Sequence, residues 1–452
     1  MGFSNDFVWG AATSAYQIEG ASSEDGKGLH IWDVYTKEEG KIYEGHTGDI
    51  ACDHYHRFRE DVRQMKEMGL KAYRFSIDWS RVLPEGTGKI NEKGIAFYSD
   101  LVDALLEAGI EPYITLFHWE LPYELYKKGG WMNRDIAEWF GEYAGLISER
   151  FSDRVTHFFT LNEPQCFIGL GYLRGENAPG VKAPVRDTFL MAHNALRAHG
   201  RGVQMLRQKA KRPIKVGYAP TGPMNYPASQ RPEDIEAARA AFFSMPELSN
   251  WTWNVAWWSD PVLLGCYPEE GLVRYEKYLP RITEEDMRLI SEPIDIYGQN
   301  IYNGNCICMG PDGKPRVMER KEGFPRTATN WPVVPECIYW GPKFLYERYH
   351  KPIYLTENGI SCRDVLSLDG KVHDPGRIDF LNRYLREVKR AVEDGVDIRG
   401  YFLWTLMDNF EWASGYSERF GLLYVDFETQ ERIWKDSAYW YKDVIRTNGE
   451  NL

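Results

Sequence analysis

The sequence FFTLNEP at residues 158–164 is a run of apolar and β-branched residues that ends in an amide, a carboxylate and a proline. The same plan returns in IYLTENG at residues 353–359, where a glycine takes the place of the proline. Residues that favour β structure, followed by a chain-breaking residue, are typical of a buried strand and its end. The two segments therefore predict two strands that present Glu163 and Glu357 to one common site.

Six further strand-like runs occur along the chain, and segments with helical periodicity separate them. The eight predicted strands span residues 7–17, 71–78, 111–119, 156–163, 214–221, 295–302, 352–359 and 399–408. Amphipathic helices are predicted at residues 55–69, 91–109 and 378–395, and each ends at a glycine of the kind that caps helices. Eight strand–helix pairs in strict order predict the α/β class and a single (β/α)8 TIM barrel rather than a doubly wound sheet. Residues 1–452 are expected to form this one domain.

Two segments of the predicted barrel are unusually long. Residues 223–293 and 303–351 follow the fifth and sixth predicted strands and are rich in Trp, Pro and Gly. We expect both to form enlarged βα loops on the face of the barrel where active sites lie, and where substrate specificity is built.

Polar and aromatic side chains stand at the carboxyl ends of seven predicted strands. The set comprises Gln17, Arg74, His118, Trp119, Asn162, Glu163, Asn300, Tyr302, Glu357 and Trp404. A single polar residue at a strand end usually marks a solvated terminus, but the carboxyl ends of all strands in a parallel barrel open on one face. Agreement among so many strands therefore predicts one site on that face.

The composition favours a neutral, sugar-like ligand. Aromatic residues make up 14% of the chain and include 16 Trp, whose flat faces suit sugar rings as well as protein cores. The formal net charge of -12 repels phosphate backbones and argues against nucleic acid as a partner. No apolar run approaches the roughly 18 residues of a membrane-spanning helix, so no membrane partner is expected.

The cysteines and the first residues predict a cytoplasmic protein. Seven Cys, an odd number scattered over the chain, favour reduced thiols over a disulfide framework. Cys306 and Cys308 have a spacing found in metal sites but lack partners, so we interpret them as ordinary thiols. Residues 1–10 contain neither the basic nor the apolar region of a secretory signal. The sequence predicts no oligomeric state.

Two glutamates beside a neutral, aromatic-lined site predict glycoside hydrolysis. One carboxyl protonates the leaving oxygen, while the other attacks the anomeric carbon or activates water. The sequence contains no P-loop, dinucleotide-binding turn or GxSxG motif after a strand, and no cofactor is expected. His54 and His56 could open a metal site, but they lead into a predicted helix, so we favour a structural or capping role and expect no metal.

Several longer motifs are specific to one enzyme family. They are FVWGAATSAYQIEG (7–20), DHYHRFREDV (53–62), YRFSIDWSR (73–81), TLNEP (160–164), YLTENG (354–359), NFEWASGYSERFGLLYVD (409–426) and KDSAYWYKDVI (435–445). Through them the chain resembles glycoside hydrolase family 1, the β-glucosidase family, over almost its whole length. The resemblance implies a retaining double displacement with Glu163 as general acid/base and Glu357 as nucleophile, with carboxyl groups about 5 Å apart.

The resemblance also implies roles for the surrounding residues. Asn162 matches the donor to the sugar 2-hydroxyl. Arg74 and Tyr302 match the groups that orient the nucleophile and lower its pKa, whereas burial should raise the pKa of the acid/base. The other predicted substrate-binding residues are Gln17, His118, Trp119, Glu411 and Trp412 for the glucosyl ring, Trp404 as its stacking platform, Trp331 on the aglycone side, and Asn300 and Phe420.

Three positions depart from the family pattern. Asn177, Thr221 and Cys337 stand where histidine, asparagine and glycine are common, and we expect all three to lie toward the aglycone side. The resemblance implies a cofactor-free exo-β-glycosidase for β-glucosides and short β-linked oligosaccharides, with some activity on β-galactosides or β-fucosides. Two alternatives stay open, a 6-phospho-β-glycosidase and a catalytically silent sugar-binding protein. The stretch SERFG at 417–421 disfavours the former, because Glu418 stands where a phosphate-binding lysine would be.

Overall fold

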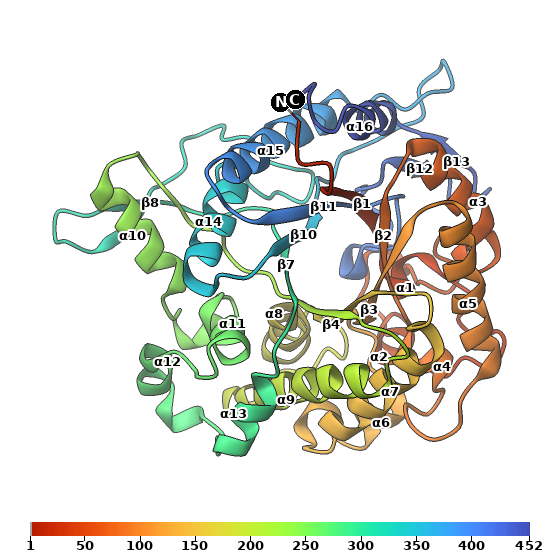
Figure 1. Cartoon of the computed structure of the whole chain (residues 1–452), viewed down its shortest axis with the longest axis horizontal. Helices are drawn as coiled ribbons and strands as arrows, with labels where there is room; N and C mark the ends of the chain where they lie inside the picture. The colour runs from red at the N-terminus through yellow and green to blue at the C-terminus, as the bar shows by residue number, and fades with distance from the viewer. Residues whose placement is uncertain (1) are drawn as a thin grey trace.

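Eight parallel strands close into a barrel in the computed structural model, which describes residues 2–452 (Figure 1). The barrel strands are β1 (Val8–Ala12), β2 (Ala72–Ser76), β3 (Glu111–Phe117), β4 (His157–Asn162), β5 (Lys215–Ala219), β7 (Ile296–Asn300), β10 (Ile353–Asn358) and β11 (Ile398–Trp404). Around the barrel they follow chain order, and β11 closes the ring on β1 through pairs such as Gly10 with Phe402. Each predicted strand overlaps one barrel strand, so the predicted (β/α)8 barrel is confirmed.

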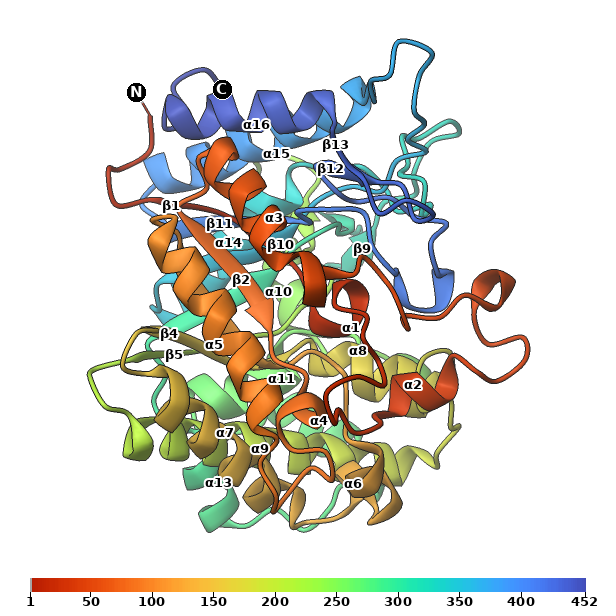
Figure 2. The ribbon, with the colours of Figure 1, turned by 90° about the vertical axis from the view of Figure 1, so that its right-hand side faces the viewer.

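Helices cover the outside of the barrel. The longer ones are α3 (His54–Met68), α5 (Glu92–Glu107), α7 (Ile136–Phe151), α9 (Val185–Lys209), α10 (Pro232–Phe243), α14 (Cys337–Tyr349), α15 (Pro375–Glu393) and α16 (Asp436–Arg446). The shorter ones are α1 (Ala15–Ile18), α2 (Ile31–Tyr35), α4 (Trp79–Val82), α6 (Tyr123–Lys127), α8 (Pro164–Ile168), α11 (Ala256–Leu263), α12 (Glu269–Arg274) and α13 (Glu284–Ile290). Figure 2 shows α5 alongside β2.

The three helices predicted from the sequence correspond to α3, α5 and α15. One face of α15 buries an apolar stripe at helical spacing, which includes Phe380, Tyr384 and Val388. Each helix is followed within two residues by a glycine with positive φ, as the capping signal predicted. These glycines are Gly69, Gly109 and Gly395.

The barrel interior is filled by large aromatic rings set against small residues. Phe159 and Phe402 belong to this inner cluster, together with Ala72 and Ala219. A Cβ on Gly217 would lie 2.6 Å from the Phe159 ring, so only glycine leaves room for that ring. These rings fill the inside of the barrel. Most polar residues of the predicted site lie at or near the carboxyl ends of the strands.

The two long segments differ from the loops we predicted. Residues 223–293 contain α10, α11, α12 and α13, and residues 303–351 contain α14 together with strands β8 (Cys306–Met309) and β9 (Pro315–Val317). Strand β8 pairs with both β9 and β6 (Tyr226–Pro227). Pro261 lies inside α11 and Pro342 inside α14, and a proline within a helix hides its pattern in the sequence. Part of each segment is therefore crossover helix rather than loop.

The ends of the described chain meet at one side of the barrel (Figure 1). The amide of Phe3 donates to the carbonyl of Asn448 at 2.9 Å. The hairpin of β12 (Leu423–Val425) and β13 (Arg432–Trp434) follows the last barrel strand and leads into α16. Within residues 2–452, no helix has the length and apolarity needed to cross a membrane.

Candidate active site

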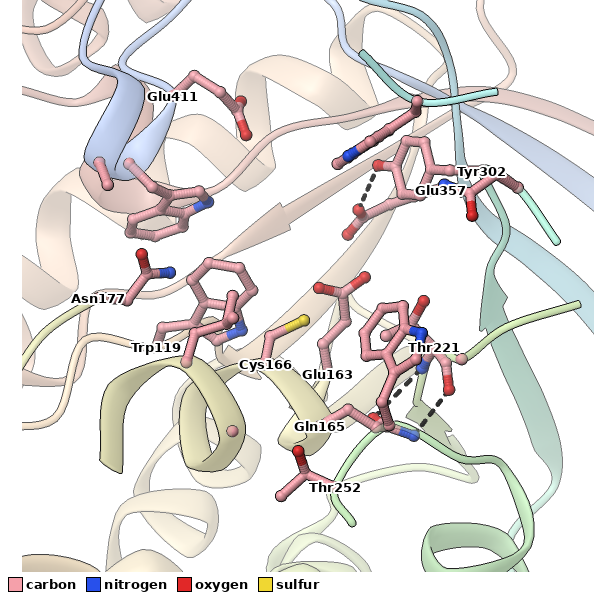
Figure 3. A pocket seen from close by; sticks show the side chains of 18 of the residues that line it. Trp119, Glu163, Gln165, Cys166, Asn177, Thr221, Thr252, Tyr302, Glu357 and Glu411 are labelled. Atoms are coloured by element: carbon pink, nitrogen blue, oxygen red, sulfur yellow. Dashed lines mark hydrogen bonds between the residues drawn. The ribbon is translucent and has the colours of Figure 1, made fainter. Parts of the chain in front are cut away.

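A cavity of about 570 Å³ opens at the carboxyl ends of the barrel strands. Ten predicted site residues line it, namely His118, Trp119, Glu163, Tyr302, Trp331, Glu357, Trp404, Glu411, Trp412 and Phe420. The other four, Gln17, Arg74, Asn162 and Asn300, are buried behind this wall and bond to one another or to lining residues. Both glutamates project into the cavity (Figure 3). The fold thus brings the whole predicted set together.

Glu163 directly follows β4 and lies at the N-terminus of α8. Its backbone has φ 47° and ψ 65°, and Pro164 begins the helix, where a missing N–H costs nothing. Its carboxyl is buried, and Asn300 donates an amide hydrogen to Oε1 at 2.8 Å. Burial, with the nearby charge of Glu357, raises the pKa of Glu163 to about 8.

Glu357 lies in β10 and receives two direct hydrogen bonds. Arg74 donates to Oε1 at 2.8 Å. The Tyr302 hydroxyl donates to Oε2 at 2.8 Å (Figure 3). Both donors lower the pKa of Glu357, as we predicted. Burial raises the pKa of Glu357 above its ordinary value, and the two donors offset only part of this shift.

Gly359 ends this strand for a steric reason. A Cβ at this position would lie 1.8 Å from the carbonyl oxygen of Trp404, so any other residue would force β10 and β11 apart. The chain breakers after the two glutamates therefore act differently. Pro164 starts a helix, whereas Gly359 allows two strand ends to approach.

Arg74 links the two carboxyl groups through one buried network. Its guanidinium contacts Glu357 and also donates to Asn162 Oδ1 at 2.7 Å and to Thr115 Oγ1 at 3.0 Å. The Asn300 amide that reaches Glu163 also donates to Asn162 Oδ1 at 3.0 Å. Burial makes these bonds strong and makes the loss of any one of them costly.

The inner end of the cavity is aromatic and carries a third, partly buried carboxyl, that of Glu411. The ring of Trp404 stacks on that of His118, with ring centroids 5.7 Å apart. The ring centroids of Trp412 and Trp119 are 4.4 Å apart. Gln17 donates to Glu411 at 3.2 Å. Burial and the charge of Glu357 raise the pKa of Glu411 to about 8.

Comparison with known proteins identifies the family. The family model described as "Glycosyl hydrolase family 1" matches residues 1–450. The chain belongs to this family. A 1,4-β-D-glucan glucohydrolase of Thermotoga neapolitana is 47% identical over 99% of each chain. The structure of a β-glucosidase from Thermotoga maritima in complex with glucoimidazole superimposes with a TM-score of 0.90, at 45% identity and 99% coverage of both chains. An aryl-phospho-β-D-glucosidase of Bacillus subtilis is 40% identical over 100% of this chain and 98% of its own.

The outer cavity of this family 1 member contains residues that the sequence motifs did not reveal. They are Gln165, Cys166, Arg174, Asn250, Thr252, Trp253 and Asn303. Gln165 and Cys166 directly follow Glu163, a position that could have indicated them, and Trp253 lies in the Trp-rich segment 223–293. The other lining residues come from connections whose course only the fold defines.

Two of the three positions that depart from the family pattern line the cavity. Asn177 and Thr221 contribute to its wall (Figure 3). Cys337 does not, because it is fully buried in the core at the start of α14. Our placement of Cys337 toward the aglycone side is therefore wrong.

The two histidines considered for a metal site are held by nearby acids. His54 is buried with Nδ1 2.7 Å from Asp61, and the exposed His56 has Nδ1 2.6 Å from Asp53. Among residues 2–452, no group of three or more His, Cys, Asp or Glu side chains is arranged to hold a metal ion. All seven cysteines are free thiols, including Cys306 in β8.

Proposed function

We propose that the protein is a retaining β-glucosidase that removes glucose from β-glucosides and short β-linked oligosaccharides. The observation that supports this proposal is that two buried carboxyls in one cavity receive hydrogen bonds from different kinds of donor. Glu357 is bonded by a guanidinium and a phenol, whereas Glu163 is bonded by a neutral amide. We further propose that residues 1–452 act as one catalytic domain and accept some β-galactosides or β-fucosides.

The two carboxyls divide the chemistry by their environments. Glu357, the better stabilised anion, attacks the anomeric carbon, and Glu163 donates its proton to the departing oxygen. Glu163 then accepts a proton from water, which displaces Glu357 and releases the sugar with its β configuration retained. Arg74 and Tyr302 hold the nucleophile in position at both steps.

The closed inner end suits one glucosyl ring. Trp404 offers a flat face for the ring, and Gln17, His118, Trp119, Glu411 and Trp412 supply a surrounding polar and aromatic shell. We assign Asn162 as the donor to the 2-hydroxyl, and its Nδ2 atom lies 3.1 Å from Nε2 of the lining residue His118. The exposed Trp331 lies at the open end, where it would contact the aglycone. A closed end opposite an open mouth favours exo cleavage.

The stereochemistry of the first product tests the proposed function. We expect ¹H NMR of an early reaction with an aryl β-glucoside to show β-glucose before mutarotation. α-Glucose as the first product would exclude the retaining mechanism. Binding without turnover would favour the sugar-binding alternative.

The pH dependence of kcat/KM is expected to fall on the alkaline side near pH 8. The pKa of Glu163 is raised to about 8, so its acid form persists below that pH and is lost above it. Profiles should be measured from pH 4 to 10 with an alkyl β-glucoside, whose poor leaving group needs the proton.

Variants of Glu163 and Glu411 test which carboxyl causes the fall in kcat/KM at alkaline pH, the alkaline limb of the profile. Glu411 also has a pKa raised to about 8, so Glu411→Gln should lower the rate yet keep the limb. Glu163→Ala should remove it. Persistence of the limb in Glu163→Ala would contradict the assignment.

Discrimination against 6-phospho-sugars separates the proposal from the phospho-glycosidase alternative. Within the described cavity wall the only Lys or Arg is Arg174, which lies at the mouth and pairs with Glu176 at 3.1 Å. A desolvated phosphate needs charge-assisted partners, and the inner wall presents Glu411 instead. Glu418, which stands where a phosphate-binding lysine would be, lies outside this wall.

We therefore expect an aryl β-glucoside to be hydrolysed at least about a hundredfold more efficiently than its 6-phosphate. This ratio corresponds to roughly 2.7 kcal/mol in transition-state binding. The measurement is kcat/KM for both substrates at one pH and ionic strength. Equal values would favour the phospho-glycosidase alternative.

We also propose a cytoplasmic location and small-molecule rather than nucleic-acid partners. Support comes from the seven free thiols, which suit a reducing compartment, and from the net charge of -12. Fractionation of the native host followed by immunodetection would test the location.

A further inference from the structure

Thr356 precedes Glu357 in β10, and its hydroxyl lies behind the cavity wall. The side chain is fully buried, and Oγ1 lies 2.7 Å from Asn300 Oδ1. We propose that Thr356 is a positioning residue for the acid/base, because its hydroxyl holds the Asn300 amide in the one orientation that donates to Glu163. The inference rests on the proposed function, in which Glu163 is the acid/base.

Arg74 sets the direction of the hydrogen bonds. A guanidinium can only donate, so the Asn162 atom 2.7 Å from it must be the carbonyl oxygen. The Asn300 atom 3.0 Å from the same oxygen must then be a donor, which is the amide nitrogen. That nitrogen is also the atom 2.8 Å from Glu163 Oε1.

The opposite end of the Asn300 amide is consequently its carbonyl oxygen, which can only accept. The Thr356 hydroxyl facing it therefore donates. Without this donor, a buried oxygen would lose its partner, and the alternative amide orientation would become competitive. In that orientation the oxygen of Asn300 would face the oxygens of Asn162 and Glu163, and the donor to the acid/base would be lost.

The donor matters because Glu163 becomes a carboxylate as it protonates the leaving group. An N–H bond to the anion stabilises the charge that develops and lowers the pKa of Glu163, partly opposing burial. Loss of the correct Asn300 orientation should make Glu163 a weaker acid. Substrates that need protonation would then react more slowly, while substrates with activated leaving groups would be spared.

Thr356→Val tests this directly, since valine keeps the shape and removes the hydroxyl. We expect kcat/KM for an alkyl β-glucoside to fall by about tenfold, the scale of one hydrogen bond to a charged group. For 2,4-dinitrophenyl β-glucoside the change should stay within about twofold. The alkaline limb of kcat/KM should move to higher pH. Thr356→Ser keeps the hydroxyl, so kcat/KM for both substrates and the position of the alkaline limb should match those of the wild type.

Thr160 in β4 offers a matched control. It is equally buried, but its hydroxyl lies 2.6 Å from His199 and outside the network of Glu163. Thr160→Val should therefore leave the ratio of the two substrates and the alkaline limb unchanged. Thr356→Ala removes the same hydroxyl without adding bulk and should reproduce the valine result if Thr356→Val folds poorly.

Three outcomes would overturn the inference. They are an unchanged substrate ratio and alkaline limb in Thr356→Val, equal losses for both substrates, or a serine variant as impaired as the valine variant. Restoration of Glu163→Ala activity by azide tests the acid/base assignment independently of Thr356, so failure of the inference can be told apart from failure of the proposed function. If rescue occurs and Thr356→Val behaves as wild type, only the role of Thr356 fails. If rescue is absent, the acid/base assignment itself fails.

Discussion

Replacement of Glu357 by glycine is expected to reduce hydrolysis of aryl β-glucosides by at least about 10⁴-fold, the scale seen when a covalent nucleophile is removed. Without this carboxyl no glycosyl-enzyme can form, because Glu163 lies on the leaving-group side. The same variant should still transfer glucose from α-glucosyl fluoride to an acceptor alcohol. The fluoride mimics the missing intermediate, and Glu163 can still act as the base.

Product analysis checks this result, with the transfer product resolved by chromatography and its linkage assigned by NMR. Glu411→Gln is the control, since it alters a nearby, partly buried carboxyl without removing the nucleophile. It should weaken hydrolysis yet produce no transfer from the fluoride. Residual hydrolysis by Glu357→Gly within about tenfold of wild type would show that another group attacks the anomeric carbon.

Glu163→Ala is expected to lower kcat/KM for alkyl β-glucosides by about 10²- to 10⁴-fold, the usual contribution of general acid catalysis. Activated 2,4-dinitrophenyl β-glucoside should lose much less in its first step, because its leaving group departs without a proton. Azide should then restore turnover, since the smaller side chain leaves space for a nucleophile that needs no general base. The expected product is the β-glucosyl azide.

Glu163→Gln provides the matched comparison. Glutamine keeps the size of the side chain and can still accept from Asn300, but it leaves no space for azide. We therefore expect both variants to lose acid catalysis and only Glu163→Ala to be rescued. An α-configured azide product would rule out the retaining assignment.

Local signals in the sequence were sufficient to predict the barrel. Buried strands appear as short β-forming runs, and helices such as α15 show apolar spacing followed by a capping glycine. These signals depend on neighbours within a few positions, so they survive without any knowledge of the fold. The same procedure missed the helices around Pro261 and Pro342, because tertiary packing there overrides an unfavourable local residue.

The electrostatics of the site were less predictable. The donors to Glu357 and their lowering of its pKa were predicted correctly, but the larger, opposing effect of burial was not, since no motif reports how deeply a carboxyl is buried. Cys337 was misplaced for a related reason. A residue type that is unusual for the family can point into the core as readily as into the cavity.

The sequence alone determined which side chains end the strands, and a parallel barrel then brings those strand ends to one face. It thereby specified both carboxyls and several other residues of the cavity wall. Only the tertiary structure decided how these groups interact. Arg74 and Glu357 are 283 positions apart, yet one 2.8 Å bond joins them. Hydrogen-bond direction and desolvation depend on such distances between remote segments, and these distances exist only once the barrel has closed.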